Sequence, residues 1–329
     1  MSMKELSMDR ICRKSYNERD LYTIRGKGMT LQQLKYLVTV AECGSISEAA
    51  QKLFVSQPSL SAAIQNLEKE MGVTAFSRSS KGVVITREGE ELLAYSRMLL
   101  EQADIMQEHF GKDKNRTPKF SVSCQHYSFA VNAFVDLVKQ YDASQYNFIL
   151  RETQTGEIID DVAQGKSEVG ILYLSAHNEE VLTKLMKKNG LVFEELFVAD
   201  PHVFICREHP LANKKEITLD DLQPNPYLVF EQGERNSFYF AEEFLSMLDF
   251  PKNIQVRDRA TLFNLVIGLN GFTVCSGVID QKLNGENIIA KPLVSDCDMR
   301  IGMIRMKNTM LSRYALYYQE AIKNYLAIV

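Results

Sequence analysis

Apolar residues recur every three or four positions in the first segments after residue 29. Residues 31–41 show this helical spacing, and Gly44 follows them as a helix stop. Ser47 is placed to cap a second, shorter helix that carries apolar residues as far as Leu53 inward. The pattern therefore predicts two consecutive helices with a short connection.

A third helix is predicted after the short turn "FVS". Ser56 stands at its N-cap position, and Pro58 falls in its first turn, where a missing N–H costs nothing. Its apolar stripe ends before Gly72 and consists of Leu60, Ile64, Leu67 and Met71. Beyond it, "VTAFSRSSKGVVITREG" indicates two short strands around the turn "SSKG". Together these elements predict a winged helix-turn-helix.

The opposite face of the third helix is polar. In helix-turn-helix proteins this helix enters the DNA major groove, where Gln can pair with adenine and Ser reaches bases or phosphates. The candidate base-reading residues are Ser56, Gln57, Pro58, Ser59, Ser61 and Gln65. The candidates for phosphate contacts, in and after the wing, are Arg78, Lys81 and Arg87. The alternative is an exposed amphipathic helix of an interaction domain.

A long helix is predicted from Thr86, its cap, to about residue 111. Its a/d-like seam consists of Leu92, Ser96, Leu99, Ala103, Met106 and Phe110. We expect the helix to pair two copies of the chain into a dimer; the alternative is a helix packed only on its own domain. The polar stretch 111–118 ends in proline and predicts a hinge.

From residue 119 onward the pattern alternates between strands and helices. The first predicted set consists of strands 119–124, 147–153 and 168–174 and helices 128–141 and 156–165. The second set consists of strands within 192–208, 227–233, 253–258 and 271–277 and helices 238–248 and 261–270. A last helix is predicted within 311–326. Such alternation implies largely parallel sheets in an α/β fold.

Charge is unevenly distributed along the 329 residues, whose net charge is −4. Residues 1–29 carry a net charge of +3 and residues 30–87 a net charge of +2, which favours contact with a polyanion. No long apolar run predicts a membrane span, and the N-terminus lacks a signal-peptide pattern, so we expect a cytoplasmic protein. Six cysteines without a C-x-x-C pair predict neither a zinc site nor a disulfide framework. We therefore expect no metal and no cofactor.

Catalytic motifs are missing from the sequence. It contains no G-x-S-x-G, no H-E-x-x-H, no P-loop and no dinucleotide fingerprint, so we do not expect an enzyme. A solute-binding receptor, or another small-molecule-binding protein without specific DNA readout, is the alternative to a regulator. Measuring DNA affinity at increasing salt concentration separates these alternatives. The affinity of a regulator for its operator should fall steeply as salt rises, and a receptor should show no such operator binding.

The segment from Thr30 to about Phe110 resembles the N-terminal part of bacterial LysR-type transcriptional regulators. The matching motifs are an opening L-x-x-L-x-x-L, then "GSISEAAQKLFVSQPSLSAAIQNLEKEMG", then "AFSRSSKGVVITREGEELL". The resemblance implies an α/β protein with an N-terminal all-α winged helix-turn-helix, a long linker helix and a C-terminal two-lobed effector domain like periplasmic solute-binding proteins. It implies a double-stranded DNA operator, a small-molecule co-inducer, and a dimer that assembles into a tetramer.

The resemblance also sets domain boundaries. Met29 would be the family's usual start, so residues 1–28 form an extension, either disordered or from a misassigned start, or else a basic arm on DNA. The DNA-binding domain is expected at 29–87, the linker helix and hinge at 88–118, and the effector domain at 119–329. Lobe I would comprise about 119–193 and 300–329, and lobe II about 194–299.

In this fold the effector would bind between the lobes, near strand ends and helix starts. The lobe I candidates are Ser123, Gln125, His126, Ser128, Thr153 and Thr155. The lobe II candidates are Glu231, Gln232, Asn236, Ser237 and Thr261. These hydroxyls and amides suit a polar metabolite with a carboxylate, although each Ser or Thr could instead be a helix cap. Segments such as "CQHYSFAVNAFVDLV" are similar to a Gram-positive subgroup linked to sulfur-amino-acid genes, which implies control of such genes.

Overall fold

The computed structural model describes residues 28–79, 82–110, 117–141, 145–235, 237–279, 285–296 and 298–326. It comprises two compact units, Met1–Ser96 and Arg97–Val329. The predicted extension therefore lies outside the described residues, except for Gly28. Each unit is described by itself.

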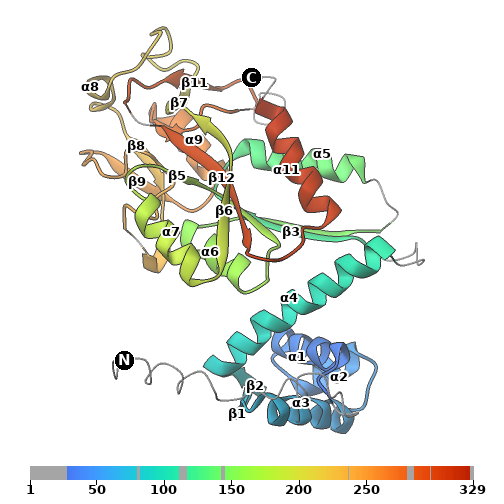
Figure 1. Ribbon diagram of the computed structural model, residues 1–329. Coiled ribbons are helices and arrows are strands. Elements are labelled where there is room, and N and C mark those ends of the chain that lie inside the picture. The colour runs from blue at the N-terminus through green and yellow to red at the C-terminus, as the bar shows by residue number, and fades with distance from the viewer. Residues whose placement is uncertain are drawn as a thin grey trace, which may run out of the picture. The chain divides into compact units, whose positions relative to one another are not determined.

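The first unit contains the three predicted helices and the wing (Figure 1). Its elements are α1 (Leu31–Cys43), α2 (Ile46–Lys52), α3 (Gln57–Met71), β1 (Phe76–Ser79), β2 (Gly82–Ile85) and the start of α4 (Arg87–Phe110). Thr30 and Gln33 form a capping box at the start of α1. Gly44 and Gly72 end α1 and α3 in the left-handed conformation, which glycine adopts without a Cβ clash.

The cap of α2 differs from the prediction. Ser45, not Ser47, is the N-cap, because its hydroxyl accepts a hydrogen bond from the Glu48 N–H. Ser47 lies one residue inside the helix, and its hydroxyl donates instead to the side-chain oxygen of Gln57 at 3.1 Å. Ser47 therefore connects α2 to the first residue of α3.

The predicted stripe of α3 supplies much of this unit's core. Leu60, Ile64 and Leu67 are buried, and Leu60 packs in a cluster with Val40 and two alanines of α2. The carboxylate of Glu68 accepts hydrogen bonds from the first backbone N–H groups of the wing, those of Ala75 and Phe76. The wing strands pair antiparallel from Phe76 opposite Ile85 to Ser79 opposite Gly82. The observed domain is a winged helix-turn-helix.

Lobe I of the second unit is built on a five-stranded sheet in the order β4-β3-β5-β12-β6. Its strands are β3 (Lys119–Cys124), β4 (Asn147–Glu152), β5 (Val169–Leu174), β6 (Leu191–Ala199) and β12 (Met299–Met306). The first three strands are parallel, as predicted, but β12 pairs antiparallel with both β5 and β6. The sheet is therefore mixed.

Helices cover both faces of this sheet (Figure 1). They are α5 (Ser128–Gln140), α6 (Thr155–Ala163), α7 (Glu179–Lys188) and α11 (Arg313–Leu326). The core on one face contains residues of α5 and α11, and the core on the other contains residues of α6 and α7. The predicted C-terminal helix thus completes lobe I.

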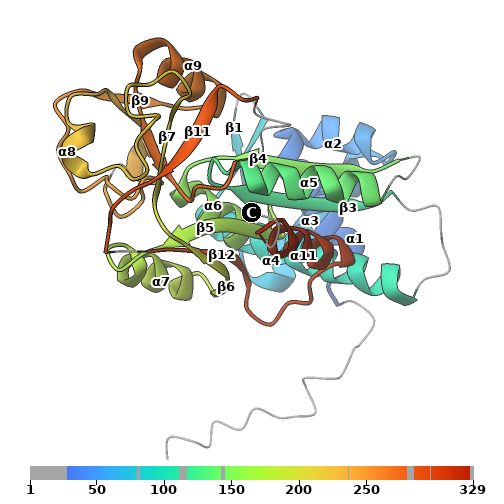
Figure 2. The same ribbon diagram turned by 90° about the horizontal axis from the view of Figure 1, so that it is seen from above.

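Lobe II lies beside lobe I within the second unit (Figure 2). Its strands are β7 (His202–Cys206), β8 (Tyr227–Phe230), β9 (Asn253–Val256), β10 (Thr273–Cys275) and β11 (Ile288–Pro292). Its helices are α8 (Leu219–Leu222), η1 (Gly233–Arg235) and α9 (Arg259–Leu269). Strand β7 lies between β10 and β11, and β8 pairs in parallel with β9.

Two predictions about lobe II need correction. Strand β6 pairs with β12 as far as Ala199, so the first lobe boundary moves from 193/194 to about 199/200. The helix predicted at 238–248 is a series of turns. Two side chains in this segment are buried carboxyls, Glu242 and Glu243, which accept hydrogen bonds from the backbone N–H groups of His126 and Phe230. These long-range bonds were not visible in the local pattern.

Candidate DNA-reading surface and interlobe pocket

The N-terminal end of α3 presents polar side chains to solvent. Ser56 caps the helix by accepting a hydrogen bond from the Ser59 N–H at 3.3 Å, and the two hydroxyls lie 2.7 Å apart. Gln57, Pro58 and Gln65 are exposed, whereas Ser61 is half-buried. Because Leu60, Ile64 and Leu67 hold the opposite face on the core, this polar surface faces solvent, as the predicted DNA contact requires.

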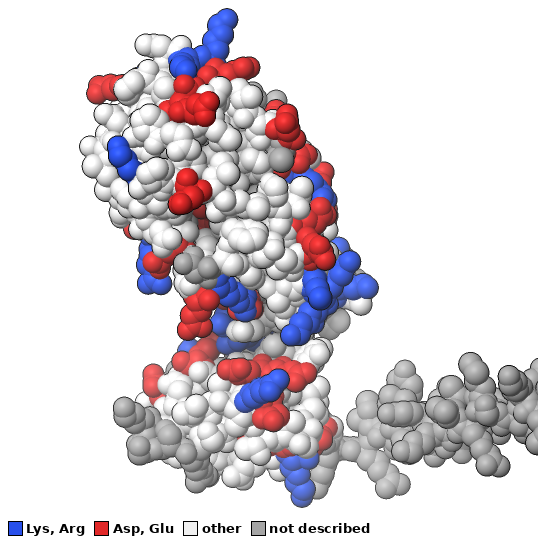
Figure 3. Space-filling view, turned by 90° about the vertical axis from the view of Figure 1, so that its left-hand side faces the viewer, with Lys and Arg blue, Asp and Glu red and all other residues white. Residues whose placement is uncertain are grey.

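The cationic candidates are placed less completely. Arg87 is exposed at the first position of α4. Lys81 and the side chain of Arg78 lie outside the described residues. On the face visible in Figure 3, basic and acidic side chains are interspersed. The residues described on that face therefore form no single basic patch.

Four predicted effector residues come together between the lobes in one hydrogen-bond network. The Gln125 amide, which is buried, donates to the Thr155 hydroxyl at 2.6 Å. The Thr155 N–H donates to the side-chain oxygen of Gln232, across from lobe I to lobe II, at 3.1 Å. Gln232 in turn donates to Glu242 at 3.3 Å. This network joins the lobes rather than leaving its polar groups open.

His126 is the fourth predicted residue and meets the same carboxylate. Its backbone N–H donates to Glu242 at 2.9 Å, and its ring Nδ1 also lies 2.9 Å from that carboxylate. The ring stacks on Phe230 with centroids 3.8 Å apart. Burial lowers the pKa of His126, but the Glu242 carboxylate outweighs it and leaves the pKa above its ordinary value. The ring is therefore held as a partner of Glu242.

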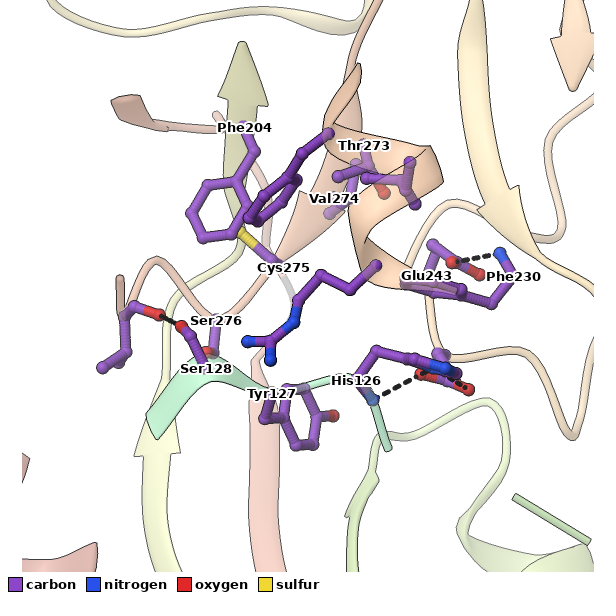
Figure 4. A pocket seen from close by; sticks show the side chains of 15 residues that line it. His126, Tyr127, Ser128, Phe204, Phe230, Glu243, Thr273, Val274, Cys275 and Ser276 are labelled. Carbon is purple, nitrogen blue, oxygen red and sulfur yellow. Dashed lines mark hydrogen bonds and ion pairs between the residues drawn. The ribbon is translucent and has the colours of Figure 1, made fainter. Parts of the chain in front are cut away.

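A pocket of about 40 Å³ adjoins this contact (Figure 4). Its polar lining consists of His126, Tyr127, Ser128, Glu242, Glu243, Arg259, Thr273 and Ser276. Its remaining lining consists of Phe204, Phe230, Leu262, Phe263, Val274, Cys275 and Val278. Figure 4 shows Phe204 and Cys275 on one side and His126 with Phe230 on the other. The volume admits about two or three water molecules.

Arg259 and Glu243 give this pocket its charge pattern. Arg259, at the start of α9, forms an ion pair across the lobes with Glu152 at the end of β4, at 3.1 Å. Glu243 accepts from the Phe230 N–H at 2.7 Å, and its second oxygen has no hydrogen-bond partner among the described residues. Burial, together with the neighbouring Glu242, raises the pKa of Glu243 well above its usual range. The pocket therefore offers a guanidinium and a buried carboxyl whose burial favours the protonated form.

Comparisons with known proteins agree with both parts of this architecture. The model for the bacterial regulatory helix-turn-helix protein of the lysR family matches residues 31–90. The model for the LysR substrate binding domain matches residues 124–326. The chain belongs to the LysR family. It is a DNA-binding transcriptional regulator with an effector-binding domain.

Individual relatives extend over most of this LysR-type regulator. The Escherichia coli uncharacterized HTH-type transcriptional regulator YnfL is 31% identical over 214 residues, which is 64% of this chain and 68% of YnfL. Bacillus subtilis AlsR is 26% identical over 73% of this chain and 77% of AlsR. A full-length OxyR variant from Pseudomonas aeruginosa superposes with a TM-score of 0.65 at 21% identity, covering 90% of this chain and 95% of OxyR. This last similarity supports the fold.

CbnR in complex with its target DNA has the same fold. It superposes with a TM-score of 0.54 at 19% identity, over 90% of this chain and 100% of the CbnR chain.

No helix among the residues that the structure describes is long and apolar enough to cross a membrane. The same residues contain no cluster of three or more side chains suited to a metal ion.

Several predicted effector residues of this regulator do not line the pocket. Ser123 is buried inside lobe I, where it bonds to Asp161 and Ser167 at 2.7 and 2.8 Å. Thr153 donates to Glu157 one turn further along the chain. Glu231 pairs with Arg257, outside the pocket lining.

The four remaining candidates have different outcomes. The Thr261 N–H is bonded to the helix cap Asp258, and the Thr261 side chain is exposed. Ser237 is also exposed, and Asn236 lies outside the described residues. Ser128 does line the pocket, where its hydroxyl donates to the Val278 carbonyl at 3.0 Å. The polar residues predicted after strands thus lie in the pocket lining at Ser128 and away from it at Ser237 and Thr261.

The pocket also contains residues that the sequence analysis missed. Glu242 and Glu243 lie in the segment mispredicted as a helix, and Arg259 stands two residues before the predicted candidate Thr261. Ser276 directly follows β10, so the strand-end rule that selected Ser128 could have found it. No local signal distinguishes Arg259 from the exposed Arg257.

Proposed function

We propose that this regulator reads its operator with the N-terminal end of α3, and that a small metabolite with a carboxylate, bound in the interlobe pocket, controls it. The observation that carries the effector assignment is the guanidinium of Arg259, which lines the pocket and is held in place by Glu152. A guanidinium binds a carboxylate with two parallel hydrogen bonds. When protonated, the form that burial favours, the Glu243 carboxyl can donate a hydrogen bond to a second polar group of the same molecule.

The proposed effector acts on an equilibrium between lobe positions. The pocket encloses about 40 Å³ while the lobes are joined as observed, so a metabolite larger than a few waters needs a more open arrangement to be enclosed. The lobes are joined by the Thr155–Gln232, His126–Glu242 and Arg259–Glu152 contacts, and also by the ion pair of Arg235 with Asp160 at 2.9 Å. An effector that binds a more open arrangement shifts the population toward it.

A dimer through α4 completes the proposal. The residues of the predicted a/d seam differ in exposure. Ser96 is buried, whereas Leu99 and Met106 are 46% and 58% exposed. Exposed apolar side chains seven residues apart lie on one face of a helix and suit pairing with a second copy. A tetramer, and control of sulfur-amino-acid genes, remain predictions. Leu99→Glu combined with Met106→Glu should convert a dimer to a monomer in analytical ultracentrifugation; an unchanged mass would contradict pairing at this face.

Thermal unfolding of the full chain tests the effector site. Short-chain carboxylates and their uncharged amides are the probes. At least one carboxylate should raise the unfolding midpoint by several degrees while its amide does not, since ligand binding stabilises the native state. Arg259→Gln should remove this shift. Arg257→Gln is the matched control, because Arg257 lies two residues away but outside the pocket lining. Equal shifts with carboxylate and amide, or a shift retained in Arg259→Gln, would contradict the proposal.

A further inference from the structure

The turn between α2 and α3 places an unusual residue in a left-handed backbone conformation. The Val55 N–H donates to the Ala50 carbonyl at 3.0 Å, and the Phe54 N–H donates to the Gln51 carbonyl at 3.1 Å. These two bonds form a Schellman motif, which requires a positive φ at the residue after the helix C-cap. That residue is Phe54, with φ of 54°. Glycine ordinarily fills this position because a Cβ is disfavoured there.

Nothing in the described fold uses the Phe54 ring. Its side chain is 96% exposed, whereas the next residue, Val55, packs against the core of the domain. The other described non-glycine residues with positive φ are asparagines, Asn270 and Asn308, a type that tolerates this conformation. Phe54 therefore combines a strained backbone, which opposes stability, with an aromatic ring that gains no stability from burial.

The position of this turn points to DNA as the partner of the ring. Phe54 stands two residues before Ser56, the N-cap of α3, and three before Gln57. It is thus continuous with the exposed end of the recognition helix. We propose that the Phe54 ring contacts operator DNA directly, packing on a thymine methyl group or on deoxyribose carbons beside the bases that Gln57 reaches. Apolar contact with a thymine methyl contributes to base readout. The inference rests on the proposal that α3 is the reading helix.

Two substitutions separate the structural cost of Phe54 from its function. Phe54→Gly removes both the strain and the ring, and Phe54→Tyr retains the ring. The full-length protein is tested on a duplex that it selects from a random-sequence pool and on an unrelated duplex of equal length. Phe54→Gly should raise the unfolding midpoint by about 2–4 °C. It should also weaken binding to the selected duplex about tenfold. Phe54→Tyr should stay within about twofold of the wild type.

Higher stability with weaker operator binding is a combination that a merely structural residue would not give. Met71→Ala, about 20 Å away at the other end of α3 by helix rise, is the control and should leave affinity unchanged. Unchanged operator affinity in Phe54→Gly would overturn the inference. If operator affinity is unchanged but the oligomer dissociates, or only transcription falls, the inference is also overturned. Either result would assign the Phe54 ring to a protein partner. If Gln57→Ala has no effect while Phe54→Gly weakens binding, the reading role of Gln57 fails and the Phe54 contact stands.

Discussion

The start of α3 and the contact between the lobes carry the same kinds of polar side chain, but those of α3 are exposed and those between the lobes are buried. Gln57 is exposed at the start of α3, where its side-chain oxygen accepts a hydrogen bond from the Ser47 hydroxyl of the neighbouring helix. Gln125 is fully buried and bonds to Thr155, Tyr127 and the backbone of Tyr173. The difference shows that a polar residue at a predicted binding position can be free to bind a partner or can stabilise the fold. Its burial and its hydrogen bonds determine which role it has.

The largest expected effect of this contrast is on stability. Gln125→Ala leaves the Thr155 hydroxyl, the Tyr127 hydroxyl and the Tyr173 N–H without the Gln125 amide in a buried site. We expect a loss of about 2–5 kcal/mol in the free energy of unfolding. Urea-induced unfolding measures it, with Gln57→Ala as the control, which should change stability by less than about 0.5 kcal/mol. Equal losses in the two variants would remove the distinction between the two glutamines.

For operator binding, unlike stability, the larger effect should come from Gln57→Ala. Gln57→Ala should weaken binding to the selected duplex by about 1–3 kcal/mol, with little change on a random duplex. Fluorescence anisotropy at fixed salt measures both affinities. A loss of the same size on both duplexes would show that Gln57 contributes no base readout.

The interlobe contact should also respond to pH. The net pKa of His126 is raised, because Glu242, assisted by Glu152, outweighs burial and the Arg259 charge. A group with a raised folded-state pKa contributes stability that is full below its unfolded pKa, about 6.5 for histidine, and is lost as pH rises through the folded pKa. The unfolding midpoint of the effector domain should therefore fall as pH rises above about 6.5.

Other groups add to this pH dependence, so a variant is needed to isolate His126. Burial raises the pKa of Glu101 to about 8, which gives a dependence of the same sign, whereas burial lowers the pKa of His209, which gives the opposite sign. The measurement is the difference in unfolding midpoint between the wild type and His126→Gln across the pH range. That difference in midpoint should shrink as pH rises. A constant difference would show that the His126 charge plays no part in holding the lobes.

The smallest expected effect is at Thr153, a predicted effector residue that lies off the pocket lining. Its hydroxyl donates to Glu157 at a partly exposed site. Thr153→Ala should change stability by less than about 0.5 kcal/mol. It should also leave the carboxylate-induced shift of the unfolding midpoint intact. Loss of that shift would return Thr153 to the effector site and extend the site along the end of β4.

The elements of the first unit were predictable because their signals are local. Ser56 and Gly72 bound α3, and the spacing of Leu60, Ile64 and Leu67 fixes its buried face, so the exposed face follows. The cap at Ser45 instead of Ser47 is an error of two residues in the same local signal. The helix predicted at 238–248 failed for a different reason. Glu242 and Glu243 bond to residues 116 and 13 positions away in the chain, and no periodicity encodes such contacts.

The sequence by itself determined that this chain forms a winged helix-turn-helix followed by alternating strands and helices, because helix caps, apolar periodicity and turns act over a few residues. The two-lobed arrangement was implied by the resemblance to LysR-type regulators. Only the tertiary structure decided which polar residues face the pocket. It brought His126 together with Glu242 and Arg259, which follow it by more than a hundred residues. It also placed the Ser123 side chain in the interior of lobe I. Side chains that meet only after the lobes assemble leave no mark on the local pattern, so their burial and partners belong to the folded chain.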